Sequence, residues 1–281
     1  MNSKKDLSCF KAYDVRGKLG DEFNEEIAYR IGSATAESLR AKILVLGFDA
    51  RETSPSLSKS IAKGVCDAGC DIMEIGLAGT EEIYAAVSAF GADAGIEVTA
   101  SHNPINFNGM KIVKKGSQPL SELEFSNIKK LAEENNFTLS KHPGFVTDKR
   151  AVAREVYIDK LLSFVDLPNL KPLKIVLNSG NGAAGPTLDA LSCKLKEKGV
   201  KSNFFYVNHE PDSSFPNGIP NPLLEENRLS TSYNVKKEKA DFGVAFDGDF
   251  DRCFLFDHQG NFVSGEYIVG LLSEIFLNKE K

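Results

Sequence analysis

Short apolar runs alternate with amphipathic segments along nearly the whole chain, and this alternation constrains the fold more than any other feature. Residues 43–46 read ILVL, a run typical of a buried strand, while residues 24–41 place Ile27 and Ile31 on one helical face. Strands separated by helices favour parallel pairing, because the chain returns along each helix before the next strand begins. We therefore predict an α/β protein made of two consecutive α/β domains with mixed, mainly parallel sheets.

The domain boundaries follow from the places where the alternation stops. Residues 136–150 have no clear period and contain Pro143-Gly144, which indicates a linker. A lone helix at 265–277 follows the second unit and is typical of the start of a third. We predict domains at 1–150, 151–258 and 259–281. The predicted strands are 43–46, 71–75, 95–98, 110–113, 173–177, 203–207, 242–246 and 253–256; the predicted helices are 24–41, one starting at 54, 81–90, 120–135, 151–165, 186–198, 224–237 and 265–277.

Charge and composition exclude several classes of partner. The net charge is −5 and no long basic run occurs, which argues against nucleic acid or an anionic membrane surface as a partner. No segment approaches the ~18 apolar residues of a membrane helix, and the first seven residues lack a signal peptide's apolar core. The five scattered cysteines are expected to be reduced core thiols, so we predict a cytoplasmic protein. The sequence does not give the oligomeric state.

Three carboxylates follow the predicted strand 242–246. Asp247, Asp249 and Asp251 stand at alternate positions, where they repel one another unless a cation lies among them. A calcium EF-hand would need Gly and Glu where this chain has Arg252 and His258, so that motif fails. Hard oxygen ligands favour Mg²⁺, and the competing interpretation is an acidic turn without a metal.

A serine set among turn-forming residues follows the predicted strand 95–98. The segment 99–104 reads TASHNP, so Ser101 has an exposed hydroxyl, with His102 and Lys111 as candidates for proton handling and anion contact. Taken alone, this segment is more typical of a capped surface turn than of a catalytic site. Together with a loop that can hold Mg²⁺, it indicates phosphoryl transfer through a phosphoserine.

Other interpretations of these segments stay open. In an aspartyl phosphatase, Asp247 would be the nucleophile and Asp249 the acid, but Asp251 and the serine segment would then have no role. The cluster Gly180-x-Gly182-x-x-Gly185 matches a dinucleotide fingerprint and would indicate an oxidoreductase. Pro186 predicts that the helix starts too late for that contact, which favours a tight turn. A binding fragment without catalytic activity is a third alternative.

Three arginines are candidates for charge contacts. Arg16 could bind phosphate as a bidentate donor. Arg51, two residues after Asp49, is interpreted as a structural ion pair. Arg252 follows the acidic loop and either balances its charge or faces the substrate.

Taken together, these segments resemble the α-D-phosphohexomutase family, most closely its bacterial phosphomannomutase branch. The similarity runs in order from about Cys9 to the C-terminus. It rests on FKAYDVRG at 10–17, TASHNP at 99–104 with GMK at 109–111, the glycine cluster at 178–186, and the acidic motif at 246–253. The resemblance also implies that the glycine cluster belongs to the second domain and binds no dinucleotide.

The resemblance implies an isomerase that interconverts mannose 6-phosphate and mannose 1-phosphate; a phosphoglucomutase of the same family is the alternative. A hexose 1,6-bisphosphate is the implied intermediate and activator, and Mg²⁺ the implied cofactor. Residue by residue, the resemblance implies that Ser101 is the phosphoserine and that the metal ligands are Asp247, Asp249 and Asp251 together with an oxygen on Ser101. It implies that phosphate contact and proton transfer are carried out by Arg16, His102 and Lys111. The residues that would position the substrate or the loop are Tyr13, Asn103 and Arg252.

The chain departs from this family in two ways. Phe250 replaces a glycine that is common in related mutases, without changing the ligand positions. The family also has four domains, with a sugar-contacting loop in the third and a phosphate loop in the fourth, and neither occurs here. Gly265-Glu266-Tyr267 is not that sugar loop. We therefore expect a chain that binds Mg²⁺ and accepts phosphate on Ser101 but turns over poorly.

Overall fold

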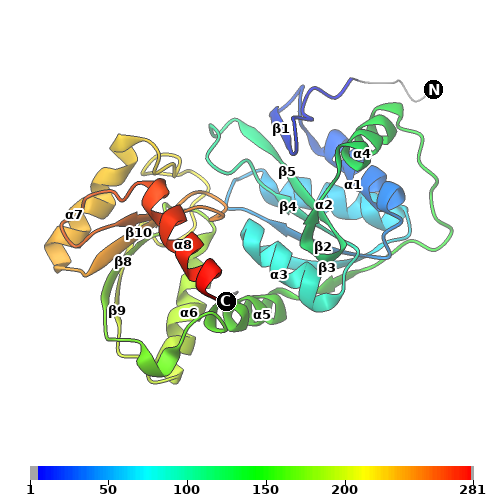
Figure 1. Cartoon of the computed structure of the whole chain (residues 1–281). Coiled ribbons are helices and arrows are strands. Elements are labelled where there is room, and N and C mark those ends of the chain that lie inside the picture. Colours follow the sequence, from blue (N-terminus) through cyan, green and yellow to red (C-terminus); the bar gives the residue numbers. More distant parts are fainter. Residues whose placement is uncertain (1–5, 280–281) are drawn as a thin grey trace.

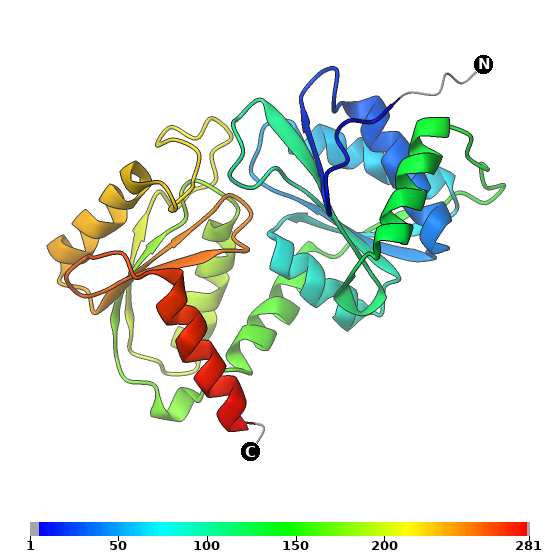
Figure 2. The same cartoon turned by 45° about the horizontal axis from the view of Figure 1, so that its top comes forward.

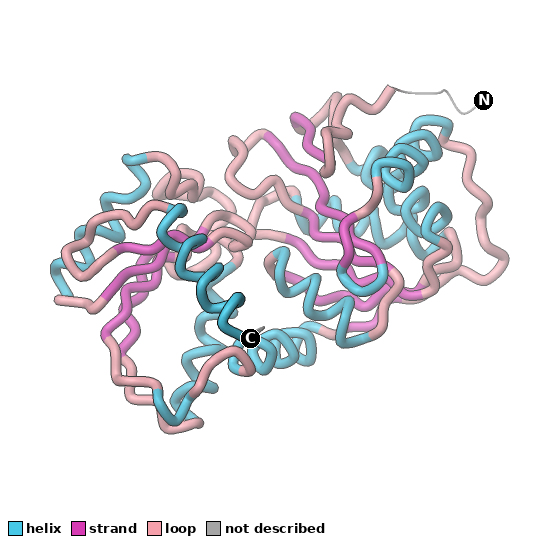
Figure 3. Tube along the Cα trace, viewed as in Figure 1, coloured by secondary structure: helices cyan, strands magenta, loops and turns pink. Residues whose placement is uncertain are grey.

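The computed structural model describes residues 6–279, so the first five residues of the polar N-terminal segment lie outside it. Two lobes are visible in Figure 1, one coloured blue to green and one yellow-green to red. Each lobe contains its own sheet with helices packed on it, as Figure 3 shows. This arrangement confirms the predicted α/β class with two mixed, mainly parallel sheets.

The first lobe is built on a sheet with the strand order β1-β5-β4-β2-β3-β7, with β6 paired to β5. Strands β2, β3, β4 and β7 run parallel, whereas β5 pairs antiparallel with both β4 and β1. Its strands are β1 (Val15–Lys18), β2 (Ile43–Phe48), β3 (Asp71–Leu77), β4 (Ala94–Val98), β5 (Phe107–Lys114), β6 (Gln118–Pro119) and β7 (Val146–Asp148). Its helices are α1 (Glu25–Leu39), α2 (Ser54–Asp67), α3 (Thr80–Phe90) and α4 (Glu122–Glu134).

Alternate residues of the central strands supply two separate cores in this lobe. Leu44 and Leu46 of β2 point to the face covered by α1, α2 and α4, while Val45 points to the face covered by α3. Each fully buried side chain of this size contributes roughly 1.5–3 kcal/mol to folding. The two cores leave the carboxyl ends of β2, β3 and β4 as the edge from which functional loops emerge.

The second lobe has a four-stranded sheet with the order β11-β10-β8-β9. Strands β9, β8 and β10 are parallel, and β11 returns antiparallel to β10, as the predicted hairpin requires. Ile175 and Leu177 face α6, whereas Val176 faces α7. Its elements are β8 (Lys174–Asn178), α6 (Ala184–Glu197), β9 (Asn203–Val207), α7 (Leu229–Glu238), β10 (Phe242–Phe246) and β11 (Cys253–Phe256).

One helix lies between the lobes. Helix α5 (Arg150–Leu162) packs Ala153 into the core under α3, and its Tyr157 packs against the core of the second lobe. Figures 1 and 2 show α5 crossing from one lobe to the other. The predicted domain boundary at residue 150 stays a prediction, with α5 shared between the two units.

Several local predictions were wrong. The expected linker contains β7, which pairs with β3 because its main chain extends along that free sheet edge. Strand β1 was not predicted, and the expected helix 224–237 is a 3₁₀ turn (Glu225–Arg228) followed by α7. Cys193 and Cys253 are exposed, so they are not the core thiols that were expected.

The C-terminal helix, α8 (Gly265–Lys279), carries several exposed apolar side chains, among them Val269, Leu271, Ile275 and Phe276. That it opens a third unit stays a prediction. Among the described residues, no helix combines the length and apolar character needed to cross a bilayer.

Candidate active site

The serine loop, residues 99–107, leaves the carboxyl end of β4 and leads into β5. Ser101 is 3% exposed, so the expectation of an exposed hydroxyl was wrong: residues 247–252 of the second lobe cover it. Its φ angle is 49°, in the left-handed region that non-glycine residues rarely adopt. Its amide donates to the Thr99 hydroxyl over 2.7 Å, and that hydroxyl donates to Asp49 Oδ2 over 2.8 Å. These two hydrogen bonds fix the main chain at Ser101 and therefore the direction in which its side chain points.

The acid loop, residues 247–252, connects β10 to β11 in the second lobe. Phe250 in the middle of this loop also has a left-handed φ angle, 41°, a conformation that glycine adopts with less strain than other residues. The Phe250 ring is buried and occupies the space that a side chain on Gly79 would need. A Cβ added to Gly79 would lie only 2.3 Å from the Phe250 ring. Phe250 thus packs the acid loop onto the start of α3 in the first lobe.

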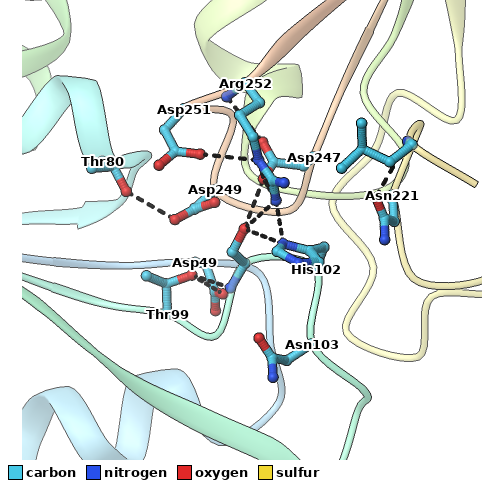
Figure 4. Close-up of polar contacts among 12 residues, drawn as sticks. Asp49, Thr80, Thr99, His102, Asn103, Asn221, Asp247, Asp249, Asp251 and Arg252 are labelled. Carbon is cyan, nitrogen blue, oxygen red and sulfur yellow. Dashed lines mark hydrogen bonds and ion pairs between the residues drawn. The ribbon is translucent and has the colours of Figure 1, made fainter. Parts of the chain in front are cut away.

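The two loops meet, although they are far apart in sequence. The Ser101 hydroxyl donates to Asp247 Oδ2 over 2.7 Å. Gly248 packs directly on the Ser101 carbonyl, so that a Cβ added to Gly248 would lie only 2.5 Å from the Ser101 carbonyl oxygen. Figure 4 shows the labelled aspartates of the acid loop beside His102 and Thr80 of the first lobe. The predicted convergence of the serine and the acidic triplet is therefore present.

The acidic triplet is compact and largely buried. Single ligand atoms of Asp247, Asp249 and Asp251 lie within 4.8 Å of one another, and the first two side chains have no exposed surface. Lys111 Nζ lies 2.6 Å from Asp249 Oδ2 and also contacts Asp251. Thr80 donates its hydroxyl to Asp249 Oδ2 over 2.9 Å, and its amide to the Asp249 carbonyl over 3.2 Å.

Burial and mutual repulsion shift the acidity of these groups. Burial, and next the charge of Asp249, raises the pKa of Asp247 to about 6, although Arg252 opposes the shift. Burial alone would raise the pKa of Asp249, but the adjacent Lys111 ammonium and its hydrogen bond lower it. Burial disfavours the Lys111 ammonium, but Asp249 and Asp251 outweigh it and raise the Lys111 pKa above its usual range.

This donor set fits a divalent metal ion. Asp249 Oδ1 is buried and, within the part of the chain that the structure describes, has no hydrogen-bond partner. A buried carboxylate oxygen without a partner is costly, and a cation would satisfy it. Three carboxylates of hard oxygen character match the preference of Mg²⁺. The residues that could hold the ion are Asp247, Asp249 and Asp251, with an oxygen carried by Ser101.

His102 and the partly exposed Arg252 both contact Ser101 Oγ. Arg252 Nη2 lies 3.1 Å from Ser101 Oγ and also contacts His102 Nδ1, while its Nε lies 2.8 Å from Asp247 Oδ2. Because arginine only donates, His102 Nδ1 must accept, so the proton of the neutral ring is on Nε2. Burial, and then the charges of Arg252 and Arg16, lower the His102 pKa, which favours this neutral form.

The remaining predicted site residues differ in how close they come. Arg16 donates from Nη1 to Asn103 Oδ1 over 3.1 Å and from Nε to Asp14 Oδ2 over 3.0 Å, so it lies beside the serine loop. Tyr13 is 84% exposed and, among the described residues, makes no hydrogen bond to that loop. The structure thus joins Arg16 and Asn103 to the site but leaves Tyr13 outside its network.

The glycine cluster is filled by protein and cannot hold a dinucleotide. Helix α6 begins at Ala184, so the expectation that Pro186 delays the helix was wrong; proline is tolerated in a first turn. The Ala183 amide instead donates to the Gly248 carbonyl over 3.0 Å, and a Cβ on Gly182 would lie 2.8 Å from that same oxygen. The cluster therefore seats the acid loop where a pyrophosphate would otherwise bind.

Some residues of the site were not found from the sequence. Thr80 is one, because its contact with Asp249 spans 169 positions. Thr99 and Asp49 are others, and only their place in a motif-bearing segment could have pointed to them. Arg51 was interpreted as an ion pair, and it does pair with Asp49, with 3.5 Å between Nε and Oδ2.

Comparison with known proteins defines the class to which this fold and site belong. The model of phosphoglucomutase/phosphomannomutase alpha/beta/alpha domain I matches residues 8–139, and that of domain II matches residues 155–260. The chain therefore belongs to the phosphoglucomutase/phosphomannomutase family.

Individual relatives make the comparison more specific. Phosphomannomutase of Escherichia coli K12 is 52% identical over 276 residues, covering 98% of this chain and 60% of the relative. The Vibrio cholerae phosphomannomutase is 50% identical, with 99% and 61% covered. A crystal structure of a family protein from Burkholderia thailandensis superimposes with a TM-score of 0.87 at 29% identity, covering 98% of this chain and 60% of that one. The chain thus spans about three-fifths of the length of these relatives.

Proposed function

We propose that this chain carries the phosphoryl-transfer site of a phosphomannomutase, an isomerase that interconverts mannose 6-phosphate and mannose 1-phosphate. The observation that carries the proposal is the 2.7 Å hydrogen bond between Ser101 Oγ and Asp247 Oδ2. It joins a nucleophile to a carboxylate cluster suited to Mg²⁺, and burying carboxylates such as Asp247 and Asp249 is costly unless cations pair with them. Relatives at 50–52% identity bear the name phosphomannomutase.

The transfer step we propose moves a phosphoryl group from Ser101 to the substrate. The bond between phosphorus and Ser101 Oγ breaks, and a bond forms between phosphorus and the free hydroxyl oxygen of the mannose phosphate, giving a hexose 1,6-bisphosphate. When bound by the three aspartates, Mg²⁺ would supply positive charge beside the phosphoryl oxygens. The bisphosphate then turns around and returns its other phosphate to Ser101.

The chain's own residues would serve this step in distinct ways. Arg252 Nη2, 3.1 Å from Ser101 Oγ, can stabilise negative charge on the leaving oxygen. The substrate hydroxyl gives up its proton as the new bond forms, and Ser101 Oγ takes up a proton once the phosphoryl group has left. His102, whose Nδ1 lies 3.1 Å from Ser101 Oγ, is the side chain we propose to carry that proton to Ser101. Lys111 would contribute positive charge to the transferring group, and Arg16 would contact phosphate beside Asn103.

Phosphate mapping tests this proposal directly. The chain is incubated with Mg²⁺ and mannose 1,6-bisphosphate, and the modified residue is located by peptide mass spectrometry. We expect a phosphoester on Ser101 that resists neutral hydroxylamine and is absent from Ser101→Ala. A hydroxylamine-labile phosphate on Asp247 would instead indicate an aspartyl phosphatase and contradict the proposal.

The sugar preference is proposed from the relatives' names. The family description covers both glucose and mannose phosphates, so glucose 1,6-bisphosphate is the competing donor. We expect mannose 1,6-bisphosphate to phosphorylate Ser101 at least as fast as its glucose isomer. Magnesium would be required with either donor, and removing it with a chelator should stop the transfer.

A further inference from the structure

The inference concerns Arg51, a buried side chain directly beneath the serine loop. Arg51 is 3% exposed, and its two terminal nitrogens donate to four main-chain carbonyls of that loop. Nη2 reaches the carbonyls of Ser101, at 2.9 Å, and Asn103; Nη1 reaches those of Pro104, at 2.9 Å, and Phe107, at 3.1 Å. An ion pair with Asp49 accounts for the charge of this guanidinium but not for these four contacts.

Asp49 ties this guanidinium to the other support of Ser101. Its Oδ1 accepts the Arg51 amide over 3.0 Å and the Ser54 hydroxyl over 2.6 Å, while its Oδ2 accepts the Thr99 hydroxyl over 2.8 Å. Thr99 in turn accepts the Ser101 amide. One carboxylate therefore fixes both groups that hold the main chain of Ser101.

Ser101 needs such support because its conformation is unfavourable. A non-glycine residue in the left-handed region costs on the order of 1–3 kcal/mol and persists only where its surroundings hold it. Thr99 holds the Ser101 amide, Arg51 holds its carbonyl, and Gly248 of the acid loop lies against that same carbonyl. The left-handed turn is what aims the hydroxyl at Asp247.

A residue of the second lobe completes the arrangement. The Phe215 ring lies with its centroid 5.9 Å from Arg51 Cζ and is 6% exposed. Phe215 belongs to the segment between β9 and α7, so the second lobe contacts the guanidinium as well as the hydroxyl of Ser101. Cation–π contact of this kind restricts the plane of the guanidinium and hence its fork of donors.

We infer that Arg51 is a positioning residue for phosphoryl transfer: its guanidinium, held by Asp49 and Phe215, locks the serine loop so that Ser101 Oγ faces the acid loop. This role rests on the proposed phosphoserine chemistry. Lysine keeps the charge but presents a compact ammonium, which cannot span carbonyls distributed over residues 101–107. Because Arg51 lies under the loop, its loss should disturb orientation and leave phosphosugar affinity unchanged.

The test compares Arg51→Lys with a matched control, Arg30→Lys. Arg30 is also buried, at 5% exposed, and pairs with Glu26 within α1, away from the serine loop. In Arg51→Lys we expect amide hydrogen exchange of residues 99–108 to accelerate about tenfold. The saturating rate of Ser101 phosphorylation by mannose 1,6-bisphosphate should fall roughly 100-fold, with the half-saturating concentration unchanged. Arg30→Lys should change neither quantity.

The outcomes separate this inference from the proposed function. If the parent chain is not phosphorylated at all, the proposed function fails, and hydrogen exchange still decides whether Arg51 holds the loop. If Arg51→Lys does not fold, Phe215→Leu replaces it, with an expected three- to tenfold loss of saturating rate, about what a cation–π contact is worth. An unchanged rate and unchanged exchange in the folded variant, or an equal loss in Arg30→Lys, overturns the inference.

Discussion

The serine loop and the acid loop form one site, yet they are held in opposite ways. The serine loop is fixed mainly from within its own lobe, by Thr99 and Arg51, which Asp49 anchors. The carboxylates of the acid loop are held largely from the other lobe, by Lys111 and Thr80. The nucleophile is therefore preformed, whereas the shape of the metal-binding side depends on how the two lobes sit together.

The charges of the two regions differ as well. Beneath the serine loop, one buried carboxylate faces one buried guanidinium, Asp49 with Arg51. In the acid loop, three carboxylates share Lys111 and Arg252, and the pKa of Asp247 is raised to about 6 by burial and by Asp249. A deficit of positive charge therefore exists only on the side where a metal ion is proposed.

Removing Lys111 should give the largest effect. In Lys111→Met, the buried Asp249 loses its cation, and breaking such a pair costs about 3 kcal/mol of unfolding free energy in the absence of Mg²⁺. Because the variant needs a cation more than the parent does, Mg²⁺ should stabilise it by a larger amount. Urea unfolding with a chelator and with Mg²⁺ measures both quantities.

Lys114→Met is the matched control, since Lys114 pairs with Glu124, and both side chains are about one-third exposed. Such a pair contributes about 0.5 kcal/mol, and Mg²⁺ should not change that value. Equal losses in the two variants would mean that the acid loop does not depend on a cation from the first lobe.

The second prediction tests the close contact between the loops. In Gly248→Ala, the added methyl group would lie 2.5 Å from the Ser101 carbonyl, so the acid loop must move away from the serine loop. We expect a loss of about 2 kcal/mol, typical of overpacking, together with weaker Mg²⁺ binding measured by calorimetry. Gly270→Ala in α8, where nothing lies within 4 Å, should leave Mg²⁺ binding unchanged. Unaltered binding in Gly248→Ala would show that the loops need not touch.

The same contrast explains how far the sequence could predict the site. The alternate spacing of Asp247, Asp249 and Asp251 was enough to indicate a cation site, because repulsion among close carboxylates is a local property. The partners Thr80 and Lys111 lie on another lobe, and no local pattern places them there. Arg51 could be paired with Asp49 from their spacing, but four main-chain carbonyls leave no trace in a sequence.

The secondary structure could be predicted where a local pattern determines it, and could not where contacts with distant segments determine it. The buried strands β2, β4, β8 and β10 follow from apolar runs, since both faces of each are covered. Strand β7 has only three residues, with an alternation too short to detect, and forms because the edge of β3 is free. Pro186 misled because its position in the first turn depends on where α6 begins. The residue before that start, Ala183, contacts Gly248 of a distant loop, and a local sequence pattern does not give this contact.

The third prediction uses Glu97, a buried carboxyl group whose pKa is affected by charges from both regions. It lies on β4, paired in register with Lys111 of β5, and among the described residues neither of its oxygens has a hydrogen-bond partner. Burial, then the charges of Asp49 and Asp249, raises its pKa well above the usual value. The first charge belongs to the support of the serine loop and the second to the acid loop.

A raised pKa in the folded state means that unfolding releases a proton once the pH exceeds the unfolded value of about 4.3. The stability contributed by protonated Glu97 is then complete below that pH and is lost as the pH rises through the folded pKa. Relative to Glu97→Gln, which cannot ionise, the parent chain should lose about 1.4 kcal/mol per pH unit within that interval. Urea unfolding between pH 5 and 8 measures the trend.

Glu124→Gln is the control, because hydrogen bonds from Lys114 and Ser121 lower the Glu124 pKa to about 2 and place its titration below this range. A difference between parent and Glu97→Gln that stays constant with pH would mean that the pKa of Glu97 is not raised in the folded state.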